Sequence, residues 1–351
     1  METELLKPIL EKYLTQKWNQ KLEIKSIHHL SGGACQDNYY LLVEFSEGKS
    51  EFPNEMVLRT DKGASLLSSL SKKEEFLVAK ILYESGVKTP RPILLEEDSS
   101  ILGSPFFLME KIQGKATGRY ITKDSELNSY RKVGMAQDLA SNLAKIHNIT
   151  PDQFKDSSIK QILKPMDKEE YIPYCISDLR ISLDALPEAH PAIEIVLNWL
   201  EANSPDSDSL VLVHGDYRTG NFMMNPSGLQ GILDFEFAHW GDRYEDIAWL
   251  CMKDWRFGKI NKEVGGFADR KDFYKYYEEE SQYQIDPNKV KYWEILGNIR
   301  WAIGSAQQAE RHLSGKDKGI ELAAIGRRTG EMEWEAMKLV EDLQNAIQTR
   351  C

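Results

Sequence analysis

The sequence has few cysteines and no excess of positive charge, and both absences narrow its possible functions. The four cysteines, Cys35, Cys175, Cys251 and Cys351, lie far apart, and no two have the short spacing of a metal site or a redox pair. We therefore expect free thiols. The formal net charge is -11, with 55 acidic against 44 basic residues. Because nucleic-acid binding needs clustered Lys and Arg to meet phosphates, the sequence predicts no nucleic-acid partner.

A long apolar run and a leader of the secretory type are also lacking. No run approaches the roughly 20 apolar residues that a membrane span needs. The chain begins METE, without the basic and then apolar order of a signal peptide. We expect a cytoplasmic protein with no membrane partner. With 351 residues, of which 41% are hydrophobic and 28% charged, the chain is long enough for two lobes that each bury a core.

One stretch, residues 210–249, carries most of the candidate chemistry. It begins with the apolar run LVLV, which is short enough for a buried strand, and continues with HGDYRTGN. Two further apolar runs, 222–224 and 231–233, are separated by NPSG, whose residue types favour a turn and therefore a β-hairpin. Asp234 follows the second run directly.

These polar residues suit phosphoryl transfer, which needs a carboxylate to accept the proton of the attacking hydroxyl and oxygen ligands to hold magnesium across the phosphates. Asp216 is the candidate base. Asn221 and Asp234 are the candidate metal ligands, since the hairpin folds them toward each other. Asp-x-x-x-x-Asn is the catalytic-loop spacing of protein kinases, and Asp-Phe-Glu stands where those enzymes carry Asp-Phe-Gly. Taken singly, each is more readily a turn or capping residue; their combination, preceded by His214, favours phosphoryl transfer.

The motifs resemble those of the aminoglycoside phosphotransferase and choline kinase superfamily, through HGDYRTGN at 214–221, DFEFA at 234–238, and GD at 241–242 followed by Asp246. The run 248–258 resembles, more narrowly, the branch of kinase-like domains fused to, or encoded beside, acyl-CoA dehydrogenases. The resemblance implies an α+β, protein-kinase-like fold of two lobes. The small N-terminal lobe would hold a five-stranded antiparallel sheet and a helix, and the larger C-terminal lobe would be mainly α-helical. ATP as co-substrate and Mg²⁺ as cofactor are implied with it.

Two features of the first lobe are candidate phosphate contacts. Gly32 and Gly33, between two strand-like runs, would let backbone N–H groups approach nucleotide phosphates, although an ordinary hairpin explains them equally well. Arg59 stands where kinases carry the lysine that pairs the α and β phosphates. Arginine can take that role because it binds phosphate bidentately; a surface arginine at a strand end is the alternative. The pattern predicts a helix at 5–13 and strands at 22–30, 39–45, 55–60, 93–95 and 105–112.

A capping-box pattern, Ser71 to Glu74, opens a helix that Gly86 ends. Glu75 lies on the apolar face of this helix, so it can turn inward and pair with Arg59, as the helix glutamate of kinases does. Glu74 is the competing partner. Its capping role makes Glu75 the preferred one.

The run FFLMEKIQG resembles the connector between the lobes in this superfamily. By that resemblance the backbone carbonyl of Glu110 and the N–H of Ile112 read the adenine edge, and Met109 forms the pocket wall. A plain edge strand fits the same run. The predicted division is a nucleotide-binding lobe over residues 1–112 and a catalytic, acceptor-binding lobe over residues 113–351.

From about Asn128 the pattern indicates helices, and apolar residues at helical spacing form one stripe that runs from Val133 to His147. His147, which ends the stripe, is a residue more typical of packing than of catalysis. By resemblance, Asp246 accepts hydrogen bonds from the catalytic-loop backbone. Trp293 and Arg300 share a helix face and can line an acceptor pocket, although such aromatics more often belong to the core. Further helices are expected at 245–250, 269–282, 289–313 and 319–348.

The leading hypothesis is a kinase that moves the γ-phosphoryl group of ATP to a hydroxyl of a small metabolite. The branch resemblance makes a hydroxyacyl-CoA the first candidate acceptor, and an aminoglycoside or other antibiotic is the alternative. Arg59 and the irregular glycine pair leave a second class open, a nucleotide-binding pseudokinase with a regulatory role. A protein kinase is less favoured because there is no Ala-Pro-Glu element and little room for an activation segment between Asp234 and Gly241. The sequence does not fix the oligomeric state.

Overall fold

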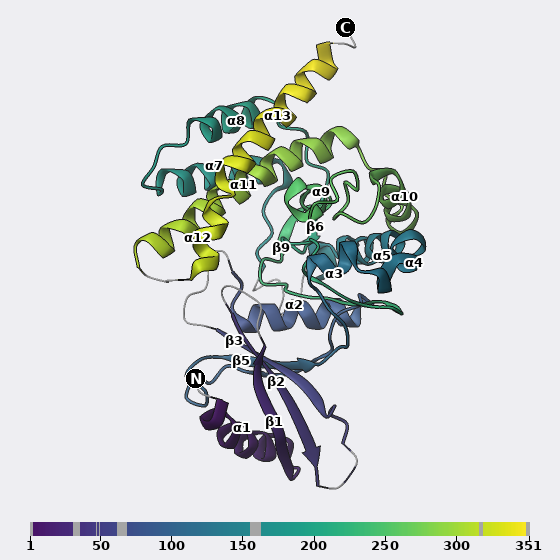
Figure 1. Cartoon of the computed structure of the whole chain (residues 1–351), viewed down its shortest axis with the longest axis vertical. Helices are drawn as coiled ribbons and strands as arrows, with labels where there is room; N and C mark the ends of the chain where they lie inside the picture. The colour runs from purple at the N-terminus through teal and green to yellow at the C-terminus, as the bar shows by residue number, and fades with distance from the viewer. Residues whose placement is uncertain are drawn as a thin grey trace.

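The computed structural model describes residues 3–30, 36–46, 48, 50–61, 69–154, 163–315 and 319–348. It has a sheet with two helices at one end and a larger helical part at the other (Figure 1). The sheet has five strands in the order β1-β2-β3-β5-β4, and every neighbouring pair is antiparallel. The predicted sheet is therefore confirmed. Its strands are β1 (Leu22–Leu30), β2 (Gln36–Phe45), β3 (Glu55–Asp61), β4 (Pro92–Glu96) and β5 (Phe106–Glu110).

Two helices accompany the sheet. Helix α1 (Thr3–Trp18) buries leucines at every fourth position, Leu6, Leu10 and Leu14, in one apolar cluster with the strands. Helix α2 (Lys72–Glu84) begins with the predicted capping box, because the Ser71 side chain accepts from the Glu74 backbone and the Glu74 side chain accepts from the Ser71 backbone.

Helix α2 also joins the two parts of the molecule. Its apolar residues Val78, Ala79 and Leu82 belong to the core of the helical part, whereas its N-terminal turn faces the sheet through charged side chains. The position of α2 between the sheet and the other helices is visible in Figure 1. Contacts of this helix therefore couple the two parts.

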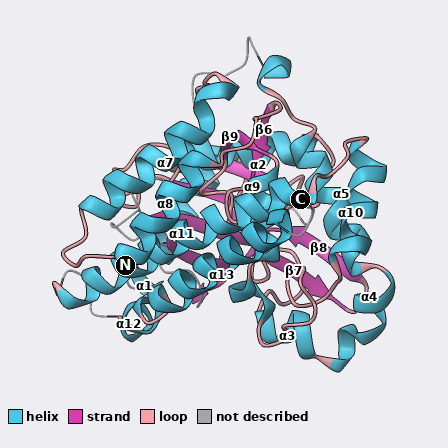
Figure 2. Cartoon of the chain, turned by 90° about the horizontal axis from the view of Figure 1, so that it is seen from above, coloured by secondary structure: helices cyan, strands magenta, loops and turns pink. Residues whose placement is uncertain are grey.

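The helical part contains two small pairs of strands. Strand β6 (Leu210–Val213) pairs with β9 (His239–Asp242), and β7 (Phe222–Asn225) forms a hairpin with β8 (Gly228–Ile232). Figure 2 shows these short strands among the helices. The longer helices are α5 (Met135–His147), α7 (Lys168–Asp184), α8 (Pro191–Ala202), α10 (Arg270–Ser281), α11 (Pro287–Leu313) and α13 (Thr329–Gln348).

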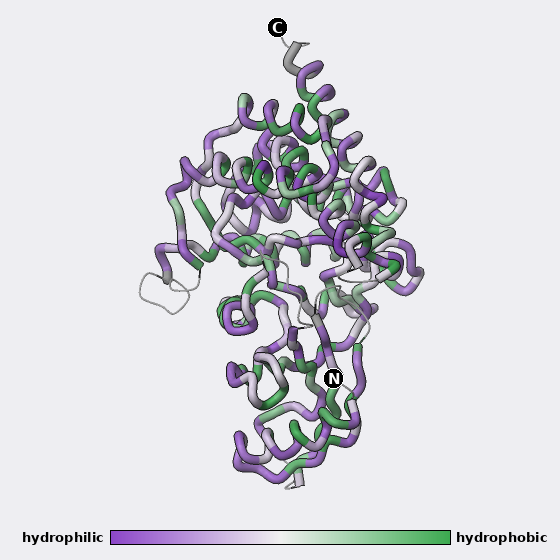
Figure 3. Tube along the Cα trace, turned by 90° about the vertical axis from the view of Figure 1, so that its left-hand side faces the viewer, coloured by the Kyte–Doolittle hydropathy of each residue, from purple (hydrophilic) through white to green (hydrophobic). Residues whose placement is uncertain are grey.

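Shorter helices complete this part: α3 (Gly118–Lys123), η1 (Ser125–Leu127), α4 (Asn128–Val133), η2 (Pro151–Phe154), α9 (Tyr244–Cys251), η3 (Lys253–Arg256) and α12 (Ile320–Gly326). Green and purple segments alternate along the helices in Figure 3, the pattern of helices with one apolar face. None of the helices in the described part of the chain has the length and apolar character to cross a membrane.

The structure corrects two helix predictions. The predicted stripe from Val133 to His147 is divided, because Gly134 ends α4 after Val133 and the rest of the stripe lies in α5. The expected helix over 319–348 is also divided into α12 and α13. Thr329 begins α13, and its hydroxyl donates to the carbonyl of Gly326 in α12.

Candidate active site

The loop after β6 is shaped by hydrogen bonds of its own residues. The His214 ring donates from Nε2 to the Leu233 carbonyl at 2.9 Å and accepts the Asp216 backbone N–H at Nδ1, at 3.2 Å. Gly215 has a φ of 77°, and a Cβ there would lie 2.3 Å from the Phe237 carbonyl oxygen. Only glycine fits where this loop crosses the segment that follows Asp234.

Asp246, in the first turn of α9, accepts hydrogen bonds from the backbone of this loop. Its Oδ2 accepts the backbone N–H of His214 at 2.7 Å, and its Oδ1 accepts that of Gly215 at 3.0 Å. His147 contacts Oδ2 through Nε2 at 3.1 Å and Tyr277 through Nδ1 at 2.8 Å. Burial lowers the pKa of His147, so the ring is neutral, donates to Asp246 and accepts the Tyr277 hydroxyl. The predicted Asp246 contacts are present, and His147 acts in packing and orientation.

Asp216 has three donors around its carboxylate. Trp249 donates from Nε1 to Oδ1 at 2.8 Å, and Asn221 donates from Nδ2 to Oδ2 at 2.8 Å. Arg218 places Nε 2.9 Å from Oδ1 and 3.1 Å from Oδ2. The side chain is 12% exposed, so it is oriented by neighbours yet open on one side.

The β7–β8 hairpin brings Asn221 to Asp234, as predicted from the turn residues. Phe222 pairs with Ile232, and the Leu233 N–H donates to the Asn221 carbonyl at 2.9 Å. Asp234 then adopts the left-handed conformation, with a φ of 71°. Few non-glycine residues do so, and the strain is typical of functional sites. The structure thus brings Asp216, Asn221 and Asp234 together.

Arg59 of β3 meets its predicted partner Glu75 and also Asp234, a pairing that was not predicted. Its Nε lies 2.6 Å from the Glu75 carboxylate, and its Nη2 forms an ion pair with Asp234. Glu74 caps α2, so Glu75 is the partner of Arg59 in this structure. Lys72, which the sequence did not single out, is buried and binds Glu75 at 2.7 Å. A charged cluster therefore ties β3, α2 and Asp234 to one another.

The ionisation of this cluster follows from its pairing. Burial on its own would raise the pKa of Asp234, but the charge and hydrogen bond of Arg59 lead the opposing effects, to which Arg218 adds, and the pKa lies below its usual range. Burial likewise opposes the charge of Arg59, yet Glu75 and Asp234 raise its pKa. Asp234 is therefore a carboxylate at neutral pH.

A cavity of about 310 Å³ lies between the sheet and the hairpin. It is lined by Arg59, Glu75 and Asp234 at one end, and its other walls include the three connector residues predicted for adenine, Met109, Glu110 and Ile112. Its volume is in the range of small-molecule sites. The adenine contacts and phosphate contacts stay predictions, and Gly32 and Gly33 lie outside the described residues.

Asp234, at this end of the cavity, and the nearby Asn221 have side chains that fit magnesium. Asp234 supplies an ionised carboxylate that is 27% exposed, and Asn221 turns its Nδ2 to Asp216, which leaves Oδ1 as its ligand atom. Magnesium is commonly held by one or two side-chain oxygens, with phosphates and waters completing six ligands. Within the described part of the chain, no group of three or more His, Cys, Asp or Glu residues is placed to hold a metal.

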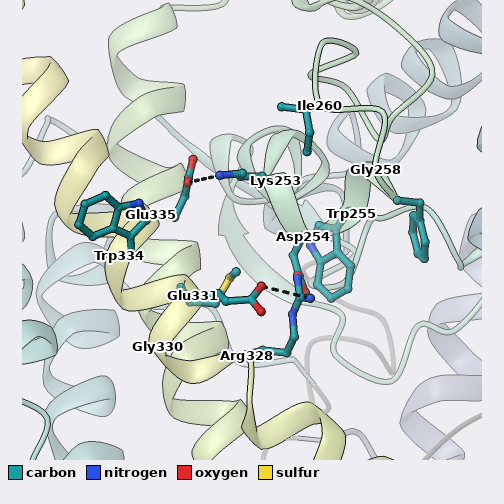
Figure 4. A pocket seen from close by; sticks show the side chains of 12 residues that line it. Lys253, Asp254, Trp255, Gly258, Ile260, Arg328, Gly330, Glu331, Trp334 and Glu335 are labelled. Carbon is teal, nitrogen blue, oxygen red and sulfur yellow. Dashed lines mark hydrogen bonds and ion pairs between the residues drawn. The ribbon is translucent and has the colours of Figure 1, made fainter.

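A second cavity, of about 700 Å³, lies between η3 and α13 (Figure 4). Trp255 connects it to the catalytic loop, because the same indole lies under the Arg218 guanidinium, 4.5 Å from ring centroid to Cζ. The charged residues of its lining are of both signs. Figure 4 shows two ion pairs among them, Lys253 with Glu335 and Arg328 with Glu331.

For Trp293 the structure shows core packing, which its helical spacing favoured over a pocket wall shared with Arg300. Trp293 is 2% exposed and packs on Tyr171 and Tyr292, so it belongs to the core. Arg300 is partly exposed and lies over the Trp249 ring at 5.2 Å. Only Arg300 therefore reaches the neighbourhood of Asp216.

Three contributors to the site were missed from the sequence. Arg218 lies inside the HGDYRTGN motif, and Trp249 follows it, but nothing in their spacing showed that both would bind Asp216. Lys72 sits at the start of α2, where a lysine is usually exposed. Its spacing of three from Glu75 was the available signal.

Asp242, at the end of β9, gives a pH-dependent prediction. It is 3% exposed, and burial, with the nearby charges of Glu245 and Asp208, raises its pKa to about 6, against hydrogen bonds from Tyr244 and Ser207. An acid with a raised pKa stabilises the fold below its unfolded pKa and loses this stability as pH rises through the folded value. From pH 4 to pH 7, the free energy of unfolding of the wild type should fall by roughly 2–3 kcal/mol relative to Asp242→Asn. Urea unfolding of both proteins at the two pH values measures this; parallel curves would contradict it.

The antiparallel sheet with its helix, the Arg–Glu pair beneath it and the Asp-x-x-x-x-Asn loop in the helical part define the class, a protein with the kinase-like fold. The model of the phosphotransferase enzyme family, APH, matches residues 26–281. The chain belongs to this family. The predicted superfamily and fold are confirmed.

The curated relatives include proteins of the predicted branch. Acyl-CoA dehydrogenase family member 10 of Mus musculus is 30% identical over 225 residues, covering 60% of this chain and 20% of its own. Acyl-CoA dehydrogenase family member 11 of Mus musculus is 26% identical over 275 residues, covering 72% of this chain and 33% of its own. The chain thus spans a third or less of the length of these relatives.

Solved structures show the same fold. A candidate aminoglycoside phosphotransferase from Ralstonia eutropha JMP134 superposes with a TM-score of 0.73 at 18% identity, covering 95% of this chain and 98% of its own. A thermostable mutant of aminoglycoside phosphotransferase APH(4)-Ia, in a ternary complex with ADP and hygromycin B, has a TM-score of 0.60 at 14% identity, with coverages of 95% and 98%.

Proposed function

We propose that the protein is an ATP-dependent, magnesium-requiring kinase that phosphorylates a hydroxyl group of a small metabolite. The observation that carries this proposal is the closeness of Asp216, Asn221 and the segment that ends at Asp234, a residue that lines a cavity of about 310 Å³. The ternary complex of APH(4)-Ia with ADP and hygromycin B supports a nucleotide and a small acceptor as the two ligands.

The chain's residues divide the work of the reaction. Glu110 and Ile112 bind the adenine edge against Met109, and Arg59, held by Glu75, binds the α and β phosphates. Asn221 and Asp234 would hold magnesium, which neutralises phosphate charge when bound.

Asp216 takes the proton of the acceptor hydroxyl as that oxygen attacks the γ-phosphorus. A bond forms between the acceptor oxygen and phosphorus, and the bond from phosphorus to the β,γ-bridging oxygen breaks. The products are ADP and a phosphate monoester. Trp249 and Asn221 fix the Asp216 carboxylate toward the acceptor by their hydrogen bonds.

The first candidate acceptor is a hydroxyacyl-CoA. The names of the relatives, acyl-CoA dehydrogenase family members 10 and 11, support an acceptor from acyl-CoA chemistry. The lining of the cavity of about 700 Å³ does not select between anionic and cationic acceptors, because its basic residues Lys253 and Arg328 are ion-paired with acidic neighbours.

The proposal is tested first by nucleotide binding. The wild type is expected to bind ATP more tightly with Mg²⁺ than with EDTA, by at least about tenfold, which corresponds to about 1.4 kcal/mol. Asp234→Asn should remove this difference, since the variant loses the charged ligand but keeps a residue type that tolerates the left-handed conformation. Titration calorimetry with and without Mg²⁺ measures both values. Asp178→Asn, a change on the exposed face of α7, is the control and should behave as the wild type.

Failure has two distinct forms. A wild-type chain that binds no nucleotide overturns the kinase proposal. A chain that binds Mg-ATP but consumes none over a panel of hydroxylated acceptors, hydroxyacyl-CoA and amino sugars included, favours the pseudokinase instead.

A further inference from the structure

Arg218 lies beside the candidate base Asp216, and the proposed function gives this arginine no role. It follows Asp216 by two residues, and its Nε donates to both oxygens of that carboxylate. Its guanidinium is stacked on Trp255, and the side chain is 26% exposed. The cation is therefore held between the candidate base and an indole, yet open to a ligand on one side.

The backbone makes room for this guanidinium. Gly220 has a φ of 122°, and a Cβ at that position would lie 2.5 Å from Nη1 of Arg218. Any larger residue would displace the arginine head. Nη1 also approaches the Thr219 carbonyl at 3.4 Å, whereas no hydrogen bond within the described part of the chain engages Nη2.

The positive charge of Arg218 also acts on the Asp234 carboxylate, after the larger effects of burial and Arg59. The proposed base and a proposed metal ligand therefore lie in the neighbourhood of one guanidinium. The group in transfer must pass between these two carboxylates, because one meets the attacking oxygen and the other the metal on the phosphates.

During the reaction, negative charge is lost from Asp216 and is present on the phosphoryl group, so Arg218 can bind the phosphoryl group as a second partner. Before transfer, its positive charge is matched by the ionised Asp216. When Asp216 takes the acceptor's proton, that carboxylate becomes neutral, and the negative charge is on the phosphoryl group in transfer. A guanidinium can bind such oxygens through Nη2 while Nε stays on Asp216, since its donors form a planar fork.

We infer that Arg218 is a further catalytic residue, whose guanidinium contacts the phosphoryl group during transfer and stabilises its charge. This inference rests on the proposed kinase function. A purely structural role, in which Arg218 only orients Asp216, is the alternative that the experiment must separate.

The experiment uses Mg-ADP with aluminium fluoride, a mimic of the phosphoryl group in transfer, and therefore needs no acceptor. The affinity of the full chain for Mg-ADP is measured by calorimetry with and without aluminium fluoride. The wild type should bind more tightly with the fluoride. Arg218→Gln should lose this tightening by about 100-fold, the scale for removing one donor to a transition-state charge, and keep its Mg-ADP affinity within about twofold. Arg218→Lys should restore part of it, because charge is kept but the fork is lost.

Two further variants separate catalysis from orientation. Asp216→Asn should keep the tightening, since it removes the base and leaves the cation in place. Arg180→Gln, at a surface arginine of α7 that binds Glu194 and Glu201, is the control and should match the wild type.

Each outcome decides the inference. If Arg218→Gln tightens as the wild type does, or the wild type binds Mg-ADP without any tightening, the inference is overturned. If Arg218→Gln and Arg218→Lys both lose Mg-ADP binding, the role is structural and the inference fails. If the wild type binds no Mg-ADP, the proposed function itself fails.

Discussion

Asp216→Asn is expected to lower phosphoryl transfer by about 10²–10⁴-fold, the usual contribution of a general base, and to leave Mg-ATP affinity within about twofold. The amide cannot accept the acceptor's proton, and its one oxygen keeps only one of the contacts with Trp249 and Asn221, because its NH₂ group cannot accept from the other donor. Asp216 is not among the residues lining the nucleotide cavity, so ground-state binding should not depend on it. The measurement is ATP consumption with the accepted hydroxyl compound, beside calorimetric binding of Mg-ATP.

The matched control for this substitution is Asp178→Asn, which makes the same chemical change on an exposed helix surface. It should keep the wild-type rate. Comparable turnover by Asp216→Asn would remove Asp216 from the role of base. A joint loss of turnover and Mg-ATP affinity would place Asp216 in nucleotide binding instead.

Features of the fold that depend on neighbouring residues could be predicted from the sequence. β1 has the predicted bounds, residues 22–30, and the Ser71–Glu74 capping box starts α2 because both partners lie within one turn. Strand β9 was not predicted, since HWGD has no strand pattern and owes its conformation to pairing with β6, about 30 residues earlier. The break at Gly134 was missed because apolar spacing continues across it.

In the site too, contacts between residues close in the sequence could be predicted, and contacts between distant residues could not. Asp216, Asn221 and Asp234 could be proposed together because a fixed spacing and a hairpin bring them close. The hydrogen bond from Trp249 to Asp216 joins residues 33 apart, and only the packing of α9 on the loop creates it. Lys72 could not be expected to be buried, since its burial depends on carboxylates of both β3 and α2. The catalytic and metal-binding roles of Asp216, Asn221 and Asp234 stay predictions.

Replacing Asp246 is expected to have the second large effect, a loss of stability. Asp246 is fully buried and accepts three N–H groups, from the backbones of His214 and Gly215 and from His147. Burial on its own would raise its pKa, but the hydrogen bond from His147 leads the opposing effects, and the pKa lies below the usual range. Its stabilisation is therefore complete at neutral pH and is lost as pH falls through the folded pKa.

Asp246→Ala is expected to lower the free energy of unfolding at pH 7 by roughly 3–5 kcal/mol, because three buried donors lose their acceptor. Asp246→Asn should lose less, roughly 1–3 kcal/mol, since one amide oxygen remains, but its NH₂ must face a backbone N–H that cannot become an acceptor. Urea unfolding at pH 7 measures both. Asp242→Asn, the same substitution four residues earlier, is the matched comparison and should stabilise the protein at this pH, because Asp242 has a raised pKa and Asp246 a lowered one. If both asparagine variants shifted stability in the same direction, the opposite electrostatics inferred for these two buried aspartates would be wrong.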